Sequence, residues 1–132
     1  IIRDSTDSWT YSTTAFRAAN NSTAMRVNLL DGGGDMAALA VNHQNAYGGT
    51  GSQAAGGIGL DSTSALAAAA TGAFGGTAVL GAMASFFSGP IGLGWHYLQA
   101  LEARYAGANA SSFFGDGGSA LTQSGLAYEV MI

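Results

Sequence analysis

The sequence carries no Asp, Glu, Lys or Arg between residues 62 and 101, and His96 is the one side chain in this run that titrates near neutral pH. The run consists mainly of Ala and Gly, with few large aliphatic side chains. Because an uncharged segment has to be covered by apolar groups, it predicts burial within the fold, in an assembly or in lipid. Its small residues favour close backbone packing in each of these settings.

The amino-acid composition excludes several classes of function and of site. Only 9% of the residues are charged, whereas a typical soluble domain has about 25%. Lys is absent and the Arg residues are scattered, so we expect no nucleic-acid binding. Cys is absent too, which excludes disulfides, thiolate metal sites and Cys nucleophiles. The 132 residues fit one domain, 1–132.

Two features favour an exported protein. The sequence begins with Ile1 rather than Met, and it has Asn-x-Ser/Thr sequons that begin at Asn20, Asn21 and Asn109. These asparagines are candidate acceptors of N-linked glycans, although chance sequons are common in a chain rich in Asn, Ser and Thr. We therefore expect an extracellular location or a place on a virion or cell surface.

The region 1–61 predicts strands followed by Gly-rich loops. Residues 9–11 alternate apolar and polar side chains, and residues 25–29 repeat this two-residue period of a half-buried strand. We expect these two segments to pair in an antiparallel sheet. A short helix is expected over 36–42, and the Gly-rich stretch 47–59 reads as an irregular connection or a binding loop.

Asp31 and Asp35 enclose three glycines, which predicts a loop because consecutive glycines cost too much backbone entropy in a helix or strand. Asp35 is expected to cap the helix that follows. The two carboxylates are also candidate ligands for a calcium ion. The further ligands and the terminal Glu of a calcium-binding loop are missing, so a turn with a helix cap is favoured over a metal site.

The region 62–106 predicts an apolar helical hairpin. Ala67 to Ala70 have the highest helix propensity in the chain, and a helix is expected over 63–87. Pro90 interrupts the run and suits the first turn of a second helix, over 91–106. In that second helix, large side chains recur at four-residue steps from Leu93 to Tyr105 and would line one face.

The first helix would offer a face for self-association or for lipid. Four-residue spacing of small residues lets a second helix approach closely. The face combines large apolar and small residues: Gly72, Gly76, Val79, Leu80, Gly81, Met83, Ser85, Phe86 and Phe87. Packing of the hairpin against its own domain is the alternative reading.

The region 107–132 predicts a turn and a C-terminal strand, in which Leu126, Tyr128, Val130 and Ile132 alternate with other residues. If this strand pairs with the N-terminal strands and the hairpin covers one face, the fold class is α+β: a small antiparallel sheet under an apolar Gly/Ala-rich helical hairpin.

The favoured function is an exported, non-enzymatic structural subunit that assembles with copies of itself through the hairpin, in a filament, a pilus-like fibre or a virion shell. No residue constellation places a nucleophile, a base and oxyanion donors together, so we expect no enzyme, no catalytic residues and no cofactor.

Two alternatives stay open. The Gly/Ala-rich apolar stretch 64–106 between strands resembles fungal killer toxins of the salt-mediated type, although the cysteines common in that group are absent. The resemblance implies a secreted, membrane-active protein that brings the hairpin to a target bilayer. The other alternative is a soluble secreted binding domain, in which Tyr47 and the Gly-rich loop contact a ligand.

Overall fold

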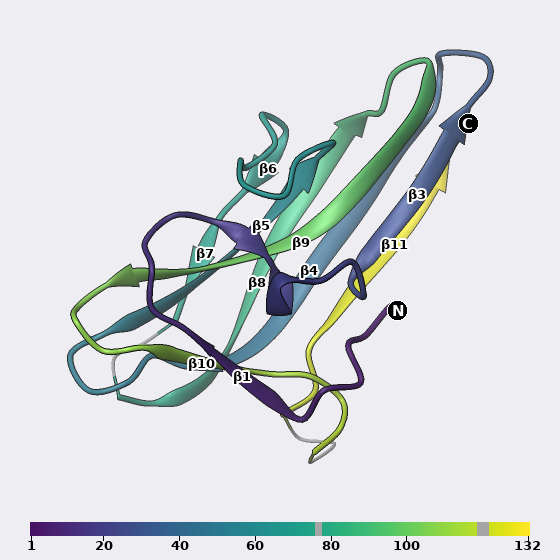
Figure 1. The fold of residues 1–132 in the computed structure, drawn as a ribbon. Coiled ribbons are helices and arrows are strands. Elements are labelled where there is room, and N and C mark those ends of the chain that lie inside the picture. Colours follow the sequence, from purple (N-terminus) through teal and green to yellow (C-terminus); the bar gives the residue numbers. More distant parts are fainter. Residues whose placement is uncertain (76–77, 119–121) are drawn as a thin grey trace.

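Two antiparallel β-sheets packed against each other form the fold in the computed structural model, which describes residues 1–75, 78–118 and 122–132 (Figure 1). Sheet A contains β1 (Ser8–Tyr11), β10 (Ser111–Phe114), β4 (Ala37–Tyr47), β8 (Leu80–Pro90), β6 (Ala70–Thr71) and β11 (Gly125–Met131). Sheet B contains β2 (Arg17–Ala18), β9 (Gly94–Ala106), β5 (Gln53–Leu60), β7 (Ala73–Phe74) and β3 (Arg26–Asp31). A short 3-10 turn, η1 (Ala19–Asn21), follows β2.

The two sheets have the same arrangement of strand pairs. In sheet A, β4 pairs along its whole length with β8, while β10 and β11 share its other side end to end. In sheet B, β9 pairs with β5, while β2 and β3 share its other side. Each sheet is therefore built around one long pair of strands, which explains the elongated shape in Figure 1.

The predicted helical hairpin is wrong, and with it the α+β fold class. Among the described residues, the region 62–106 contains no helix; it holds a loop followed by β6, β7, β8 and β9. A four-residue spacing lines one face of a helix, but it is also a multiple of the two-residue period of a strand. Met83 and Phe87 keep that spacing on the buried face of β8, so the pattern could not tell the two structures apart.

The short helix predicted over 36–42 is also wrong, since this segment opens β4. The strands predicted near Trp9, near Val27 and at the C-terminus are confirmed as β1, β3 and β11. Their pairing differs from the prediction, because β1 pairs with β10, β3 with β9 and β11 with β4. No helix within the described ranges is long and apolar enough to cross a bilayer. The hairpin on which the likeness to killer toxins rested is thus absent from them.

The interior between the sheets is apolar at both ends and polar in the middle. Along β4 the buried residues that face sheet B are, in order, Ala38, Ala40, Asn42, Gln44 and Ala46. The first two belong to a large apolar cluster and the last to a smaller one, so the amide side chains form a layer between the clusters.

Asn42 joins the two sheets directly. Its Nδ2 donates hydrogen bonds to the carbonyl oxygens of Gly57, at 2.8 Å, and Leu101, at 3.3 Å, both in sheet B. A short side chain reaches the opposite backbone only where the sheets lie close together. The neighbouring Gly56 permits this approach, since a Cβ at that position would collide with the side chain of Gln44. The absence of a side chain at Gly56 in β5 therefore permits the close spacing of the sheets at this point.

Gly59 offers a test of close packing on β5. A Cβ there would collide with the carbonyl oxygen of Ser62 and lie 3.0 Å from that of Ala65, and backbone atoms cannot move aside cheaply. We expect Gly59→Ala to lower the free energy of unfolding by about 1–3 kcal/mol in urea denaturation. Gly81→Ala is the matched control, because a Cβ at Gly81 meets nothing within 4 Å and should leave stability unchanged or raise it by up to about 1 kcal/mol. Equal effects of the two substitutions would contradict this account.

Candidate functional site

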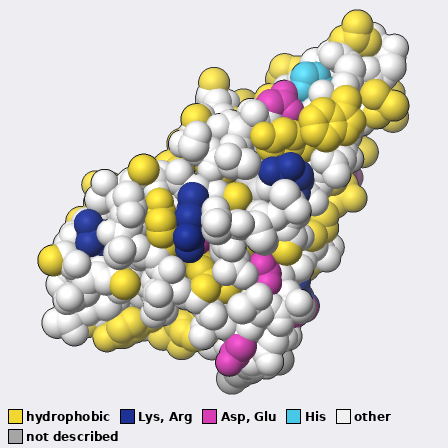
Figure 2. All heavy atoms as spheres, viewed as in Figure 1, with side chains coloured by type: hydrophobic (Ala, Val, Ile, Leu, Met, Phe, Trp, Pro, Cys, Tyr) yellow, Lys and Arg dark blue, Asp and Glu magenta, His cyan; other side chains and the backbone are white. Residues whose placement is uncertain are grey.

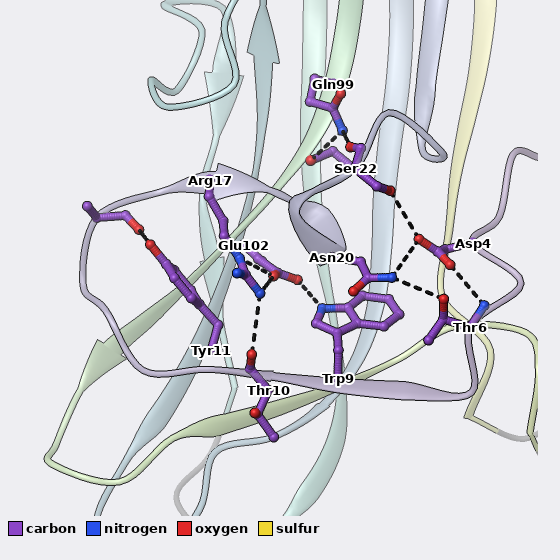
Figure 3. Close-up of polar contacts among 12 residues, drawn as sticks. Asp4, Thr6, Trp9, Thr10, Tyr11, Arg17, Asn20, Ser22, Gln99 and Glu102 are labelled. Atoms are coloured by element: carbon purple, nitrogen blue, oxygen red, sulfur yellow. Dashed lines mark hydrogen bonds and ion pairs between the residues drawn. The ribbon is translucent and has the colours of Figure 1, made fainter.

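Glu102 places a fully buried carboxylate in the middle of β9. Its Oε2 accepts a hydrogen bond from Trp9 Nε1 at 2.6 Å, and its Oε1 accepts one from Arg17 Nε at 2.8 Å (Figure 3). Burial raises the pKa of Glu102, although the bonds from Trp9 and Arg17 act in the opposite direction. Both oxygens are thus engaged in holding β1 and β2 onto β9, which gives this carboxylate a structural role.

Asp4 holds the N-terminal segment against η1 in the same region (Figure 3). Its carboxylate accepts hydrogen bonds from the Thr6 backbone N–H at 2.9 Å, Asn20 Nδ2 at 3.0 Å and the Ser22 hydroxyl at 3.2 Å. Burial acts to raise the pKa of Asp4, but these bonds outweigh it and the pKa is lowered. The network fixes Asn20 in a left-handed backbone conformation, with φ of 54°.

β11 has a backbone edge that is only partly used. On its outer side Leu126 exchanges two backbone hydrogen bonds with Ile2, each of 2.8 Å. Because peptide groups alternate in direction along a strand, the N–H and C=O groups of Tyr128 and Val130 point outwards as well. Within the described residues these groups have no backbone partner. An edge of this kind is a ready template for a further strand.

Exposed apolar side chains are present on β11 and on the next two strands of sheet A, β4 and β8. We call them the β11 surface, and they are each between 38% and 49% exposed: Leu39, Phe86, Tyr128, Val130 and Met131. A shallow groove of about 210 Å³, lined in part by Val41 and Ala127, runs between β4 and β11 on this sheet. Exposed apolar groups beside unpaired backbone groups make this the candidate interaction site of the molecule.

A second group of apolar side chains lies where β3 ends and β9 begins. Leu30 and Trp95 are directly opposite each other in the β3–β9 register and are 71% and 58% exposed. Leu93, in the loop before β9, is 70% exposed. Figure 2 shows hydrophobic side chains gathered at this end of the molecule.

The predicted self-association face is divided by the strands. Leu80 and Phe86 are exposed, whereas Met83, Ser85 and Phe87 are buried and face sheet B. The other predicted members are Val79 and Gly72, both exposed, Gly81, partly buried, and Gly76, which lies outside the described residues. Of the whole set, Phe86 alone belongs to the β11 surface.

Asp31, one of the two metal candidates, fastens the loop between β3 and β4. Its Oδ1 accepts hydrogen bonds from the N–H groups of Gly33 and Gly34, and its Oδ2 accepts one from Met36 at 2.8 Å. The bond from Met36 is the largest cause that lowers the pKa of Asp31. Asp35 is exposed, and no group of three His, Cys, Asp or Glu side chains in the described parts of the chain could hold a metal ion.

The three sequon asparagines differ in accessibility. Asn20 and Asn109 use Nδ2, the atom that would carry a glycan, to donate hydrogen bonds to Asp4 and Thr50. Asn21 is exposed, and no such bond involves its side chain among the described residues. Glycosylation of all three stays a prediction, and Asn21 is the acceptor that a glycan would disturb least.

Sequence reasoning missed the contacts that join distant segments. Trp9, Arg17 and Glu102 meet although 85 or more residues separate the carboxylate from its partners. The available signal was Glu102 itself, a carboxylate directly after an uncharged run, because a charge in such a setting needs a partner. That signal could not say which of the four basic residues would supply it.

The pairing of Trp9 with Glu102 can be tested through stability. Trp9→Phe keeps an aromatic ring but removes the N–H donor, which leaves one oxygen of a buried carboxylate unpartnered. We expect a loss of about 1.5–3 kcal/mol in the free energy of unfolding, as for hydrogen bonds to charged groups. Trp95→Phe is the matched control, since Trp95 is 58% exposed and its replacement should change stability by less than about 0.5 kcal/mol. Similar losses in both variants would refute the assignment.

Because His96 and Asp61 form a hydrogen-bonded pair, we expect the stability of the fold to depend on pH. His96 Nδ1 lies 2.6 Å from Asp61 Oδ2, and this hydrogen bond is the main cause that raises the pKa of His96. Protonated His96 therefore stabilises the fold. The stabilisation is complete below the ordinary pKa of about 6.5 and is lost as pH rises through the raised value. Burial acts to raise the pKa of Asp61, but the hydrogen bond with His96 helps to lower it. At acid pH the stabilisation by the pair ends when Asp61 takes up a proton.

Imidazole NMR shifts followed across pH give the measurement. We expect the midpoint for His96 to lie above about 6.5 and to fall in Asp61→Asn. Asn suits this position because Asp61 has a left-handed φ of 53°, which Asn tolerates. An unchanged midpoint in the variant would show that the pair does not hold the proton.

Comparisons of the chain with family models, with curated proteins and with solved structures give no match. The proposals that follow therefore rest on the geometry of the chain itself.

Proposed function

We propose that the protein is an exported, non-enzymatic structural subunit that associates with copies of itself through the free edge of β11. The observation that supports this most directly is the run of outward peptide groups at Tyr128 and Val130 beside the β11 surface. Glu129 is the one charged residue of β11, which contains no Pro. The strand thus lacks most of the devices by which proteins protect an edge from pairing.

A second copy is a suitable occupant because an antiparallel edge can pair with itself about a two-fold axis. We compare three registers of this pairing, in which the two-fold axis passes through Tyr128, Glu129 or Val130. Centring on Tyr128 would bring Val130 opposite Leu126, whose outer groups already bond to Ile2. Centring on Glu129 would set two carboxylates opposite each other, which is destabilising.

Centring on Val130 avoids both problems. It places Val130 opposite its own copy, Glu129 opposite Met131, and Tyr128 opposite Ile132. Pairs of an aromatic and a β-branched side chain are among the favourable cross-strand contacts. Pairing in this register would continue sheet A from one copy into the other and bring the exposed apolar side chains of the two β11 strands side by side.

Growth into a filament, fibre or shell needs a second contact. Phe74 and Tyr105 stack with ring centroids 4.8 Å apart and are 60% and 56% exposed. Leu80, at the start of β8, is 47% exposed. Since β8 and β9 run the length of the sandwich, these side chains lie at the end opposite Trp95. Two separate apolar surfaces on one subunit allow chains of subunits to form.

Val130→Pro tests the edge. Proline removes the outward N–H of residue 130 and places a ring on the edge, while the bonds of neighbouring residues to β4 remain. We expect the native protein to run as a dimer or larger species in light scattering coupled to size exclusion, and the variant to run as a monomer at the same concentration. Val130→Ala, which keeps the N–H, should retain the association.

A crosslink tests the register. In the pairing centred on Val130 its two copies form a hydrogen-bonded pair with Cα atoms about 5.5 Å apart, within reach of a disulfide. Because the chain has no other Cys, Val130→Cys should give a covalent dimer on mild oxidation. Tyr128→Cys is the control, since its two copies would lie about four residue spacings apart, roughly 14 Å. A native protein that stays monomeric at every concentration would overturn the proposal.

A further inference from the structure

A pocket of about 270 Å³ opens on the outer face of sheet B, away from the edge of β11. Its walls come from β2, the turn after it, β3 and the loop after β5. The residues that matter to its chemistry are Arg17, Asn21, Thr23, Arg26, Thr63 and Ser64. Two arginines from a chain with only four basic residues therefore line one pocket.

Arg26 is held in place by groups beneath it. Its Nε donates to Gln99 Oε1 at 2.9 Å, and its guanidinium lies 4.1 Å from the centre of the Tyr97 ring. Gln99 is fully buried, and its Nε2 donates towards the carbonyl oxygens of Met25, at 3.2 Å, and Ala100, at 3.0 Å. These bonds fix which way the Gln99 amide points, so its oxygen has to face Arg26.

The charge of Arg26 is not balanced within the part of the chain that the structure describes. No carboxylate there lies within ion-pair distance of it, and no side-chain or backbone acceptor bonds its two terminal nitrogens. Arg17, by contrast, is paired with Glu102 at 2.8 Å. The pocket therefore presents one free guanidinium whose remaining donors form a planar fork, the geometry that binds a carboxylate with two hydrogen bonds.

The rest of the wall is polar but neutral. Thr23, Thr63 and Ser64 are exposed and carry hydroxyls, and Asn21 carries an amide. Asn21 also holds a left-handed φ of 51°, next to Asn20 with φ of 54°. Two successive non-Gly residues in this region are uncommon, and such conformations gather at ligand sites. Phe16 adds one aromatic ring to the lining.

We infer that this pocket binds an acidic sugar unit through Arg26. A single free cation matches a group of one negative charge, such as a uronic acid carboxylate, better than a doubly charged phosphate ester. Neutral hydroxyl and amide groups match the hydroxyls of a sugar, and an aromatic ring can cover the apolar face of a pyranose. The volume is just below that of pockets for drug-sized ligands, which suits one sugar ring.

The test is calorimetric titration of the full chain, made without N-glycosylation, with glucuronate, glucose and inorganic phosphate in separate runs. We expect glucuronate to bind and glucose to bind at least about tenfold more weakly, because the charged hydrogen bonds are lost. Arg26→Gln should weaken glucuronate binding by a similar factor. Arg3→Gln, which removes an exposed cation elsewhere, should leave it unchanged.

A second variant tests the pocket independently, in case Arg26→Gln fails to fold. Thr63→Trp keeps Arg26 and its partners but fills the pocket from an exposed loop, and it should also abolish binding. No glucuronate binding, or glucuronate binding that both variants leave intact, would overturn the inference. Phosphate binding as strong as that of glucuronate would overturn the sugar class. These outcomes are independent of whether β11 pairs with a second copy.

Discussion

The close approach of the two sheets at Asn42 is the constraint on which the rest of the fold depends. A short amide from β4 reaches the backbone of sheet B, and Gly56 on the facing strand permits this approach because it carries no side chain. Hydrogen bonds of a buried side chain to backbone carbonyls are costly to lose, so they fix the register of one sheet on the other.

Most of the buried carboxylates have several hydrogen-bond partners. Glu102 is buried between two donors, and Asp4 and Asp31 accept several hydrogen bonds each. Arg26 differs from these groups, since buried Gln99 orients it and no carboxylate balances it among the described residues. In a protein with a net charge of −4, an oriented cation without a partner is the feature that most needs a functional explanation.

The sequence allowed the strands with alternating patterns to be predicted, because residues 9–11 and 126–132 show a two-residue period that no helix explains. It did not allow β8 and β9 to be predicted. Tyr97 and Leu101 lie four residues apart on one side of β9, a spacing that suits either structure, and the helix propensity of Ala is a weak prior that tertiary packing overrides. The β11 edge and the Arg26 pocket depend on which distant strands pair, which local patterns do not record.

The two proposed sites lie on different sheets, and this bears on how they could act together. Pairing through β11 joins the edges of two copies of sheet A and leaves the outer face of sheet B uncovered. Each copy would then carry its own Arg26 pocket, and an assembly would display the pocket repeatedly. A weak site for a single sugar ring gains avidity when several copies engage one polymer, provided that the spacing permits simultaneous contact. Self-association and ligand binding would in that case be two parts of one recognition function.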